Sequence, residues 1–317
     1  MISPVSLPAA LVSEFGSDRV RRDVPLAPFT TFKVGGPAEW FLETHSADET
    51  VRALKLATDA RIPISILGGG SNLLIGDKGV RGLVIRPRGA QIDSPGDGVV
   101  RAEAGATVNG LVRWTIHHGL AGLEAWAGTP GTVGGGIFGN AHFAGRLLGE
   151  LVDNVRVASL DGAIRDLRQH EMDFGYDRSR LQRTHEVLLW AVFRVGRGEP
   201  TELRETARAS LAHRKRTQPL DVSSAGCIFR NPEPGRDVMP DGIPWSAGAL
   251  VDRAGLKGAA VGGARVSPTH GNFIVNDGTA TAADIKRLVD NCRAAVRDRF
   301  GVELREEIVY LGEFDAR

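Results

Sequence analysis

The sequence predicts an α+β protein with two cores, and three observations support this fold class. Strand-like and helix-like segments alternate in both halves of the chain, as in mixed α/β or α+β architectures. The length of 317 residues corresponds to about two domains. The composition, 42% hydrophobic and 24% charged, is ordinary for a soluble globular protein that buries real cores.

The first part of the chain predicts a strand–helix–strand order. Residues 38–43 read as a strand and 48–60 as an amphipathic helix with an acidic residue near its start. Residues 62–67 form a β-branched run that ends abruptly in "GGGSN", so a glycine loop follows the carboxyl end of a strand. Further strands are expected at 82–87 and 99–106.

A helix and a hairpin are expected next. Residues 107–119 predict a helix with Thr107 as its N-cap and Gly119 as its stop. Residues 152–167 alternate around a central Asp-Gly pair, which is typical of a β-hairpin.

The composition changes near residue 200, where "GRGEP" (196–200) precedes a charged segment. We place the domain boundary there, which gives domains at 1–200 and 201–317. A charged helix is expected at 201–216, a strand at 271–276 and a final strand at 304–312. Residues 282–301 predict an amphipathic helix whose apolar face consists of Ile285, Leu288, Val289, Cys292 and Val296.

Charge and cysteine usage exclude several functional classes. The formal net charge is +1, so no global basic field recruits nucleic acid or an anionic membrane. No apolar run is long enough to span a bilayer, and the first residues lack the charged start of a signal peptide. Cys227 and Cys292 show no metal-type spacing, and the histidines show none either. We expect a cytoplasmic protein with reduced thiols and no metal.

Two glycine-rich segments stand out, "LGGGSNLLIGD" (67–77) and "GTPGTVGGGIFGNA" (128–141). Neither matches the P-loop, and "GGGSN" lacks the G-x-G-x-x-G spacing of a Rossmann fold. Glycines followed by Ser and Asn can form a nest of backbone N–H groups for pyrophosphate oxygens. Tight turns, a close helix–sheet contact or a flexible linker are the alternatives.

Six stretches together resemble the UDP-N-acetylenolpyruvoylglucosamine reductase (MurB) family, in its shorter subgroup without an inserted loop. They occur in the family's order from about residue 28 onward. The stretches are "TTFKVGGPAEW", "LGGGSNLLIGD", "GLEAWAGTPGTVGGGIFGNA", "SAGCIFRNP", "GGARVSPTHGNFIVN" and "LREEIVYLG".

The resemblance implies a two-part FAD-binding region of the vanillyl-alcohol oxidase (PCMH) type, followed by a smaller α/β substrate-binding domain. It implies non-covalent FAD, NADPH as co-substrate, and reduction of UDP-N-acetylglucosamine enolpyruvate to UDP-N-acetylmuramate for peptidoglycan. We expect a monomer with no nucleic-acid partner. The implied flavin contacts are Thr31, Val34, Gly35, Gly68, Gly69, Gly70, Ser71, Asn72, Gly128, Thr129, Pro130, Gly131, Gly134, Gly135, Gly139 and Asn140.

Hydride addition to a double bond conjugated with a carboxylate needs a proton donor and a group that stabilises the developing negative charge. The family uses a serine donor, whereas "SAGCIFRNP" places Cys227 at that position. A thiol is mostly protonated at neutral pH but releases its proton more readily than an alcohol. The resemblance also implies Glu307 as the catalytic carboxylate, with Glu306 on the opposite side of an extended chain.

The family's catalytic arginine is displaced. The family pattern is Tyr-Arg-x-Ser, but this chain reads Tyr176-Asp177-Arg178-Ser179. Either a turn lets Arg178 reach the site, or another arginine substitutes; we assign Arg178. Tyr176 is a candidate for contacting substrate phosphate or nicotinamide.

Arg214, Arg216 and His270 are further candidates for substrate binding. Ala249 stands where the family usually has lysine, so a phosphate contact has moved. Arg214 or Arg216 could supply charge to the diphosphate, or both could belong to a solvated helix end. His270 matches a family histidine near the site. The alternatives for the whole chain are another FAD-dependent oxidase of this fold and a non-catalytic nucleotide-sugar sensor.

Overall fold

The computed structural model describes residues 7–314 of the chain. They form two compact units: unit 1 contains the described residues up to Val24, Ala38–Gly69 and Arg81–Ala212, and unit 2 contains Pro25–Pro37, Gly70–Val80 and the described residues from His213 onward. Two short N-terminal segments therefore belong with the C-terminal part, and the division falls inside helix α6 (Pro200–Thr217). The domain boundary that the sequence predicts at residue 200 stays a prediction.

The first sheet of unit 1 has the strand order β1-β2-β5-β3. Its strands are β1 (Arg21–Pro25), β2 (Pro37–Thr44), β3 (Ile64–Ile66) and β5 (Val80–Pro87). β3 and β5 run parallel, with α2 (Ala47–Asp59) between β2 and β3 in the chain, so the expected β-α-β order is confirmed. Helix α1 (Leu7–Phe15), for which the sequence analysis made no prediction, shares a hydrophobic cluster with α2.

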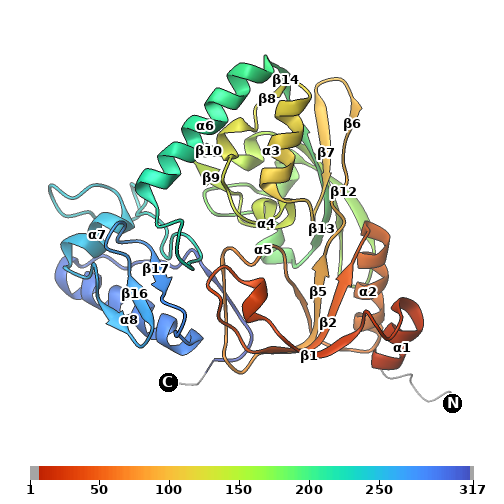
Figure 1. Ribbon diagram of the computed structural model, residues 1–317, viewed down its shortest axis with the longest axis horizontal. Coiled ribbons are helices and arrows are strands. Elements are labelled where there is room, and N and C mark those ends of the chain that lie inside the picture. The colour runs from red at the N-terminus through yellow and green to blue at the C-terminus, as the bar shows by residue number, and fades with distance from the viewer. Residues whose placement is uncertain (1–6, 315–317) are drawn as a thin grey trace. The chain divides into compact units, whose positions relative to one another are not determined.

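The second sheet of unit 1 is antiparallel, with the order β12-β11-β13-β7-β6. Figure 1 shows helices α3 (Val108–His117) and α4 (Val133–Phe138) beside it. The Thr107 hydroxyl accepts a hydrogen bond from the Gly110 N–H at 2.9 Å, which confirms the predicted N-cap. The strands are β6 (Ile92–Gly96), β7 (Val99–Glu103), β11 (Val152–Ala158), β12 (Ile164–Arg168) and β13 (Val187–Arg194).

Short elements complete unit 1. The predicted hairpin is β11–β12, and its loop is closed by a hydrogen bond from the Ser159 N–H to the Ala163 carbonyl. The small pairs and helices are β8 (Leu120–Ala121) with β14 (Gly196–Arg197), β9 (His142–Phe143) with β10 (Arg146–Leu147), α5 (Leu181–Thr184), and the 3₁₀ turns η2 (Glu124–Trp126), η3 (Leu148–Glu150) and η4 (Gln169–Met172).

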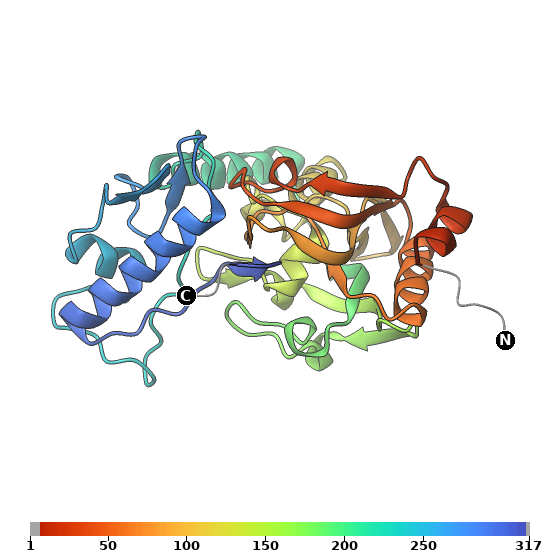
Figure 2. The ribbon, with the colours of Figure 1, turned by 90° about the horizontal axis from the view of Figure 1, so that it is seen from below.

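Unit 2 packs helices against a small antiparallel sheet. The sheet joins β15 (Ala260–Val261), β16 (Ala264–Val266) and β17 (Ile274–Asn276), and Figure 2 shows α8 (Ala282–Phe300) running along it. The predicted apolar face of α8 is confirmed, because all five of its residues are at most 1% exposed. Unit 2 also contains η1 (Ala27–Phe29), α7 (Ala247–Arg253) and the parallel pair β4 (Leu73–Ile75) and β18 (Val309–Leu311).

The start of α8 ties two distant parts of unit 2 together. Thr281 caps the helix, and the Asp77 carboxylate accepts hydrogen bonds from the Ala282 and Ala283 N–H groups, each at 2.9 Å. These contacts satisfy N–H groups that a helix leaves without partners. Within residues 7–314, no helix is long and apolar enough to cross a membrane.

Candidate active site

Cys227 and Glu307 meet in unit 2 because one short extended segment lies between two others. Cys227 forms an antiparallel bridge with Phe273 on one side. On the other side, the Glu307 N–H donates to the Ile228 carbonyl at 2.8 Å. The two residues assigned to proton transfer are thus brought together, although 80 positions separate 227 from 307 in the sequence.

Asn272 fixes the segment that carries Cys227. Its side chain is 3% exposed and both donates to and accepts from the Phe229 backbone, at 2.7 and 2.9 Å. The Ile228 N–H donates to the Asn272 carbonyl at 2.9 Å. Asn272 was not among the residues predicted from the sequence; the available signal was a polar residue near the start of the strand expected at 271–276.

The Cys227 thiol is held in its neutral form. It is a free, half-buried thiol, and burial raises its pKa above the ordinary value, reinforced by the negative charge of Glu307. A hydrogen bond with the Asn272 side chain and the positive charge of Arg214 act in the opposite direction. The thiol therefore carries its proton at neutral pH, as a proton donor must. Cys292 is 1% exposed in the core, as expected.

Glu306 and Glu307 have different surroundings. Glu306 accepts a hydrogen bond from the Arg293 guanidinium on α8 at 2.7 Å and one from the Tyr310 hydroxyl at 3.4 Å. Glu307 instead acts electrostatically on the Cys227 thiol. The alternation expected for an extended chain is present, and the ion pair with Arg293 accounts for Glu306.

In unit 1, the turn at 175–178 places Asp177 inside and Arg178 outside. Asp177 has a φ of 50° and is 4% exposed, and its Oδ1 lies 3.7 Å from where a Cβ on Gly139 would be. The Arg178 side chain is 58% exposed and pairs with Asp173 at 3.5 Å. The backbone does turn here, but the guanidinium is turned toward solvent and the carboxylate toward the glycine segment.

Hydrogen bonds connect the same turn to the end of α4. The Asn140 side chain donates to the Gly175 carbonyl and accepts from the Gly149 N–H, both at 2.7 Å, and the Ser179 hydroxyl donates to the Phe138 carbonyl at 2.7 Å. Tyr176 is half-buried, and its ring lies 4.7 Å from that of His142. His142 is a neighbour that the sequence analysis did not identify.

The basic segment at the end of α6 has two faces. Arg214 is 6% exposed, whereas its neighbours 213, 215 and 216 are exposed. Burial lowers the pKa of Arg214 to about 10, so it is still a cation at neutral pH. Arg214 and Arg216 therefore lie on different sides of α6, and the assignment of either one to the diphosphate stays a prediction.

His270 supports Asn272. Its Nδ1 accepts a hydrogen bond from the Asn272 N–H at 3.2 Å, and its ring lies 4.9 Å from that of Phe273. Burial lowers the pKa of His270, and the charge of Lys257 adds to this effect. A neutral ring with an acceptor Nδ1 fits this environment. Ala249 lies in the first turn of α7, where its N–H donates to the Ser246 hydroxyl at 3.3 Å.

Part of the segment 128–141 is helical, which none of the alternatives considered for it predicted. Residues 133–138 form α4 despite their glycines. Thr132 caps the helix by accepting from the Gly135 N–H, and the Val133 and Gly134 N–H groups donate to the carbonyls of Ala106 and Ala104. These hydrogen bonds to distant carbonyls stabilise a helix that its glycine-rich sequence does not favour on its own. Asn109 on α3, not predicted as a site residue, accepts from the Gly128 N–H at 2.7 Å.

The two glycine segments contact each other within unit 1. A Cβ on Gly69 would lie 2.6 Å from the Gly131 Cα, and one on Gly68 would lie 2.8 Å from the Thr132 Oγ1. Close backbone packing therefore explains these glycines, as one of the alternatives proposed. In unit 2, a Cβ on Gly70 would lie 2.1 Å from the Phe29 carbonyl oxygen, and the Thr31 N–H donates to the Gly70 carbonyl.

Gly135 has a different explanation. It is exposed on α4, and the nearest atom to a Cβ there would be the Thr132 Oγ1 at 3.7 Å, an ordinary contact. A helical glycine costs about 1 kcal/mol relative to alanine, and no described residue requires one here. Bare, exposed backbone at this point fits a flat ligand that approaches closely, so the residues present fit a flavin.

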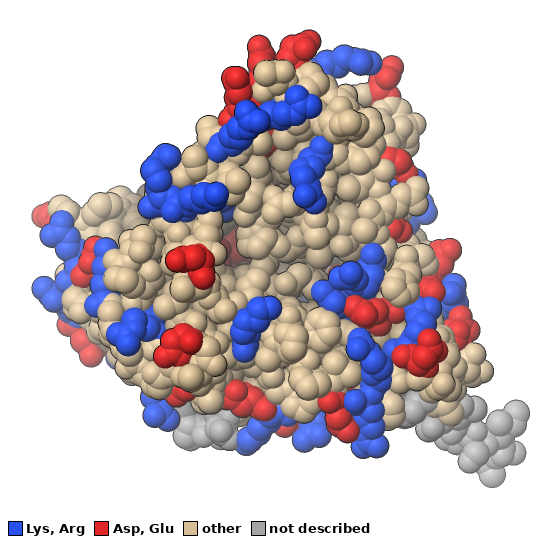
Figure 3. Space-filling model, viewed as in Figure 1, with Lys and Arg blue, Asp and Glu red and all other residues tan. Residues whose placement is uncertain are grey.

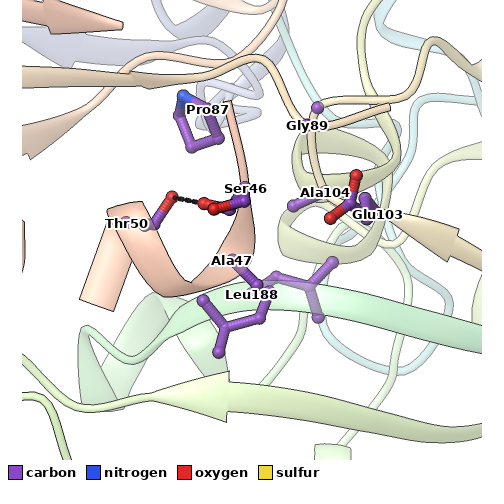
Figure 4. Close-up of a pocket in the computed structure, with 10 residues that line it drawn as sticks. Ser46, Ala47, Thr50, Pro87, Gly89, Glu103, Ala104 and Leu188 are labelled. Atoms are coloured by element: carbon purple, nitrogen blue, oxygen red, sulfur yellow. Dashed lines mark hydrogen bonds between the residues drawn. The ribbon is translucent and has the colours of Figure 1, made fainter. Parts of the chain in front are cut away.

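A small cavity elsewhere in unit 1 does not belong to this site. Figure 4 shows it between the start of α2 and the end of β7, with Ser46, Thr50 and Glu103 among its lining residues. Its volume of about 10 Å³ holds no more than one water molecule. The Thr50 hydroxyl donates to the Ser46 carbonyl at 3.1 Å, so its polar lining serves the α2 N-terminus.

Two family models match the chain: "FAD binding domain" over residues 38–168, and "UDP-N-acetylenolpyruvoylglucosamine reductase, C-terminal domain" over residues 218–311. The reductase of Parasynechococcus marenigrum is 42% identical over 302 residues, covering 94% of this chain and 97% of that protein. The reductase of Geobacillus thermodenitrificans is 34% identical and covers 96% of each chain.

The solved structure of the Thermus caldophilus enzyme, MurB, has a TM-score of 0.77 to this chain at 35% identity. It covers 92% of this chain and 99% of the Thermus protein. These matches confirm the fold class, with its FAD-binding domain and C-terminal α/β part. The chain belongs to the UDP-N-acetylenolpyruvoylglucosamine reductase family of FAD-dependent enzymes.

Proposed function

We propose that this chain uses NADPH to reduce the enolpyruvyl group of UDP-N-acetylglucosamine enolpyruvate, giving UDP-N-acetylmuramate, with Cys227 as the proton donor. The observation that carries the proposal is the meeting of the Cys227 thiol with Glu307 in unit 2. A binding protein needs neither a thiol kept protonated nor a carboxylate beside it. A cytoplasmic location and a monomeric state stay predictions.

The chain's residues supply the proton half of the reaction. FAD, when bound, would supply the hydride chemistry, by which reducing equivalents from NADPH reach the terminal carbon of the enolpyruvyl double bond. The electron pair of that bond passes to the carbon next to the carboxylate, and the Cys227 thiol gives its proton to this carbon. An S–H bond breaks, a C–H bond forms, and water later returns a proton to the thiolate.

Glu307 acts on the timing of this transfer. Its negative charge raises the pKa of the Cys227 thiol, so the proton stays on sulfur until a strongly basic carbon is present. After transfer, the thiolate lies beside a carboxylate, which favours its reprotonation. Asn272 holds the backbone on which the thiol is carried.

The exposed backbone at Gly135 supports the proposed FAD contacts, and the resemblance to the family assigns the other contacts in each unit. In unit 1 these are Gly68 and Gly69 with the segment from Gly128 to Asn140, in which a Cβ on Gly135 or on Gly139 would make only ordinary contacts, at 3.7 Å. In unit 2 they are Thr31, Val34, Gly35 and the segment from Gly70 to Asn72. The side chain of Asn140 is occupied within unit 1, so its contact with a flavin would come from the backbone.

The test is a visible absorption spectrum of the purified holoenzyme, titrated without oxygen, first with NADPH and then with UDP-N-acetylglucosamine enolpyruvate. We expect NADPH to bleach the flavin bands and the UDP-sugar to restore them. Bands that bleach and return only with oxygen would contradict the reductase and favour the oxidase.

A second candidate, a nucleotide-sugar sensor, is favoured by one observation. Asp177 is buried where the family has its arginine, and Arg178 is exposed. The same titration separates the two functions. A sensor would bind the UDP-sugar, detected by calorimetry, without reoxidising the reduced flavin.

A further inference from the structure

One glutamate of unit 2 lies on the core side of the segment that carries Glu307. Charged side chains of both signs are interspersed over the α7 and α8 region in Figure 3, where water solvates them. Glu306 differs, because it lies opposite Phe229 in an antiparallel bridge, and Phe229 is 1% exposed. Beside this bridge the Arg230 N–H donates to the Arg305 carbonyl at 2.8 Å. Residues opposite each other in such a pair project to the same face, so Glu306 is directed toward the buried side.

The neighbours of Glu306 along the chain agree with this direction. Leu304 and Ile308, two positions before and after it, are 3% and 4% exposed and belong to the core of unit 2. An extended chain places alternate residues on one face, so an acidic residue stands between two apolar ones. A carboxylate at such a position is costly unless it is paired.

Arg293 on α8 is the partner of this carboxylate. Its guanidinium donates to the Glu306 Oε1 at 2.7 Å, and the Tyr310 hydroxyl donates to the same oxygen at 3.4 Å. The Arg293 and Glu306 side chains are 30% and 22% exposed, so water compensates their charges only in part. Ion pairs at such positions add little net stability, and their best-attested role is to specify register.

Register matters here because two carboxylates are adjacent. Glu306 and Glu307 have the same chemistry, and a slip of one residue in an extended segment exchanges the faces to which they point. Such a slip would bring Glu306 to the position of the proposed catalytic carboxylate and turn Glu307 toward the core. Apolar neighbours oppose the slip, but they do not distinguish one carboxylate from the other.

We propose that Arg293 is a positioning residue for the reaction: by pairing with Glu306 it fixes the register of residues 304–308, so that Glu307 and not Glu306 is presented to the substrate. Arg293 acts through this segment and not on the reacting atoms. The role of Glu307 rests on the proposed function, whereas the register itself does not.

The charge of Glu306 makes the inference specific. Without Arg293, the carboxylate would be uncompensated on the core side, and conformations that expose it to water would become more favourable. These conformations displace Glu307. If Glu306 is also neutralised to glutamine, the amide oxygen can still accept from Tyr310 and no charge drives the displacement. The second substitution should therefore correct the first.

The first experiment is a double-substitution cycle on the holoenzyme. Stopped-flow absorbance follows reoxidation of the NADPH-reduced flavin by UDP-N-acetylglucosamine enolpyruvate. We expect Arg293→Gln to slow this step about tenfold, because a displaced catalytic group is costly. Arg293→Gln/Glu306→Gln should recover to within about threefold of the wild type, since the two effects are coupled and not additive.

Two controls accompany the cycle. Glu306→Gln alone should stay within about twofold of the wild type, because Arg293 then keeps Glu303, 3.6 Å away, and solvent. Arg297→Gln, one turn further along α8, removes a guanidinium that pairs with its neighbour Asp298 at 3.3 Å and should leave reoxidation unchanged. Reduction of the flavin by NADPH should be unchanged in every variant.

The second experiment measures the register without catalysis. Hydrogen exchange, read by mass spectrometry at single amides, gives the protection of the Glu307 N–H, which donates to the Ile228 carbonyl. We expect at least about tenfold less protection in Arg293→Gln and recovery in the double variant. General damage to the fold would lower protection in the double variant at least as much. Recovery is therefore a readout that a merely structural role does not produce.

Arg293→Lys covers the case in which Arg293→Gln does not fold. Lysine keeps the charge without the guanidinium geometry, so its losses in both experiments should be smaller. A double variant as slow and as unprotected as Arg293→Gln would overturn the inference, as would an Arg293→Gln that matches the wild type in both experiments. A wild type whose flavin no UDP-sugar reoxidises would instead defeat the proposed function, and the exchange data would still decide the register.

Discussion

The side-chain amide of Asn72 donates a hydrogen bond to the backbone carbonyl of Glu307 at 3.0 Å. The Asn72 carbonyl in turn accepts from the Val309 N–H at 3.0 Å. The end of the glycine loop is therefore fixed to the segment that carries Glu307, the proposed catalytic carboxylate, within unit 2. A residue assigned to flavin contact also positions the second half of the site.

We predict that Asn72→Ala slows reoxidation of the reduced flavin by the UDP-sugar by about tenfold, because a small displacement of a catalytic group is costly. Reduction by NADPH changes less, since Glu307 takes no part in it. Stopped-flow absorbance of the two half-reactions measures both rates. The control is Asn154→Ala, because the Asn154 side chain contacts only Asp153 among the interactions described here. This substitution should change neither half-reaction rate. Equal slowing of both half-reactions would assign Asn72 to the flavin alone.

Cys227→Ala removes the proposed proton donor and should slow reoxidation by the UDP-sugar at least about 100-fold, with reduction by NADPH retained. Cys227→Ser restores the type of donor that the family uses and should recover most of this rate. Normal turnover in Cys227→Ala would remove the assignment, because solvent would then be the donor.

The raised pKa of the Cys227 thiol predicts the shape of its pH profile. A proton donor fails once it is deprotonated, so a raised pKa extends activity toward alkaline pH. The rate of flavin reoxidation by the UDP-sugar should stay level to about pH 9, above the ordinary thiol pKa of about 8.5. A decline centred near pH 8.5 that Cys227→Ser abolishes would show an unshifted thiol.

His270 makes unit 2 sensitive to mild acid. Its pKa is lowered in the folded state, so the unfolded chain takes up the proton first as pH falls through about 6.5. Stability is thus complete at neutral pH and lost below it, until the folded pKa is reached. We expect a loss of about 1 kcal/mol between pH 7.5 and 5.5.

Urea unfolding of the wild type and His270→Asn at these two pH values measures this loss. The asparagine amide oxygen can replace Nδ1 as the acceptor for the Asn272 N–H but does not titrate. The variant should therefore lose less stability between the two pH values. An identical loss in both proteins would assign the pH dependence to other groups.

Local patterns in the sequence were sufficient for α3 and α8, because a capping residue and an apolar face lie within each segment. They were insufficient for α4. Its first N–H groups donate to the carbonyls of Ala106 and Ala104, which lie 27 and 30 residues earlier in the chain. The expected strand at 304–312 is reduced to Val309–Leu311, because β4 pairs with these residues alone.

Some features of the candidate site could likewise be predicted from local sequence, and others could not. Cys227 and Glu307 were assigned from their motifs, and the structure brings them together. The inward direction of Arg214 and the outward direction of Arg178 were not predictable from neighbouring residues. The direction of Arg214 depends on how α6 packs against other elements. The direction of Arg178 depends on the left-handed backbone conformation of Asp177, which cannot be predicted by counting residues along an extended strand.

Gly135 separates flavin binding from fold stability. In Gly135→Ala the new Cβ meets no described atom closer than 3.7 Å, so the folded apoprotein tolerates it. Alanine also favours the helix by about 1 kcal/mol, so the apoprotein should unfold at a higher denaturant concentration. FAD affinity should nevertheless fall at least about tenfold, since a methyl group fills the space that a close-packed flavin needs.

The two effects of this substitution have opposite signs, and general damage to the fold would not produce that combination. Fluorescence titration of the apoprotein with FAD and urea unfolding without it measure them separately. Thr206→Ala, at an exposed position of α6, is the control: it should gain helix propensity with no change in FAD affinity. Unchanged FAD affinity in Gly135→Ala would mean that the bare backbone of α4 faces solvent and that the flavin contacts lie elsewhere in the glycine segments.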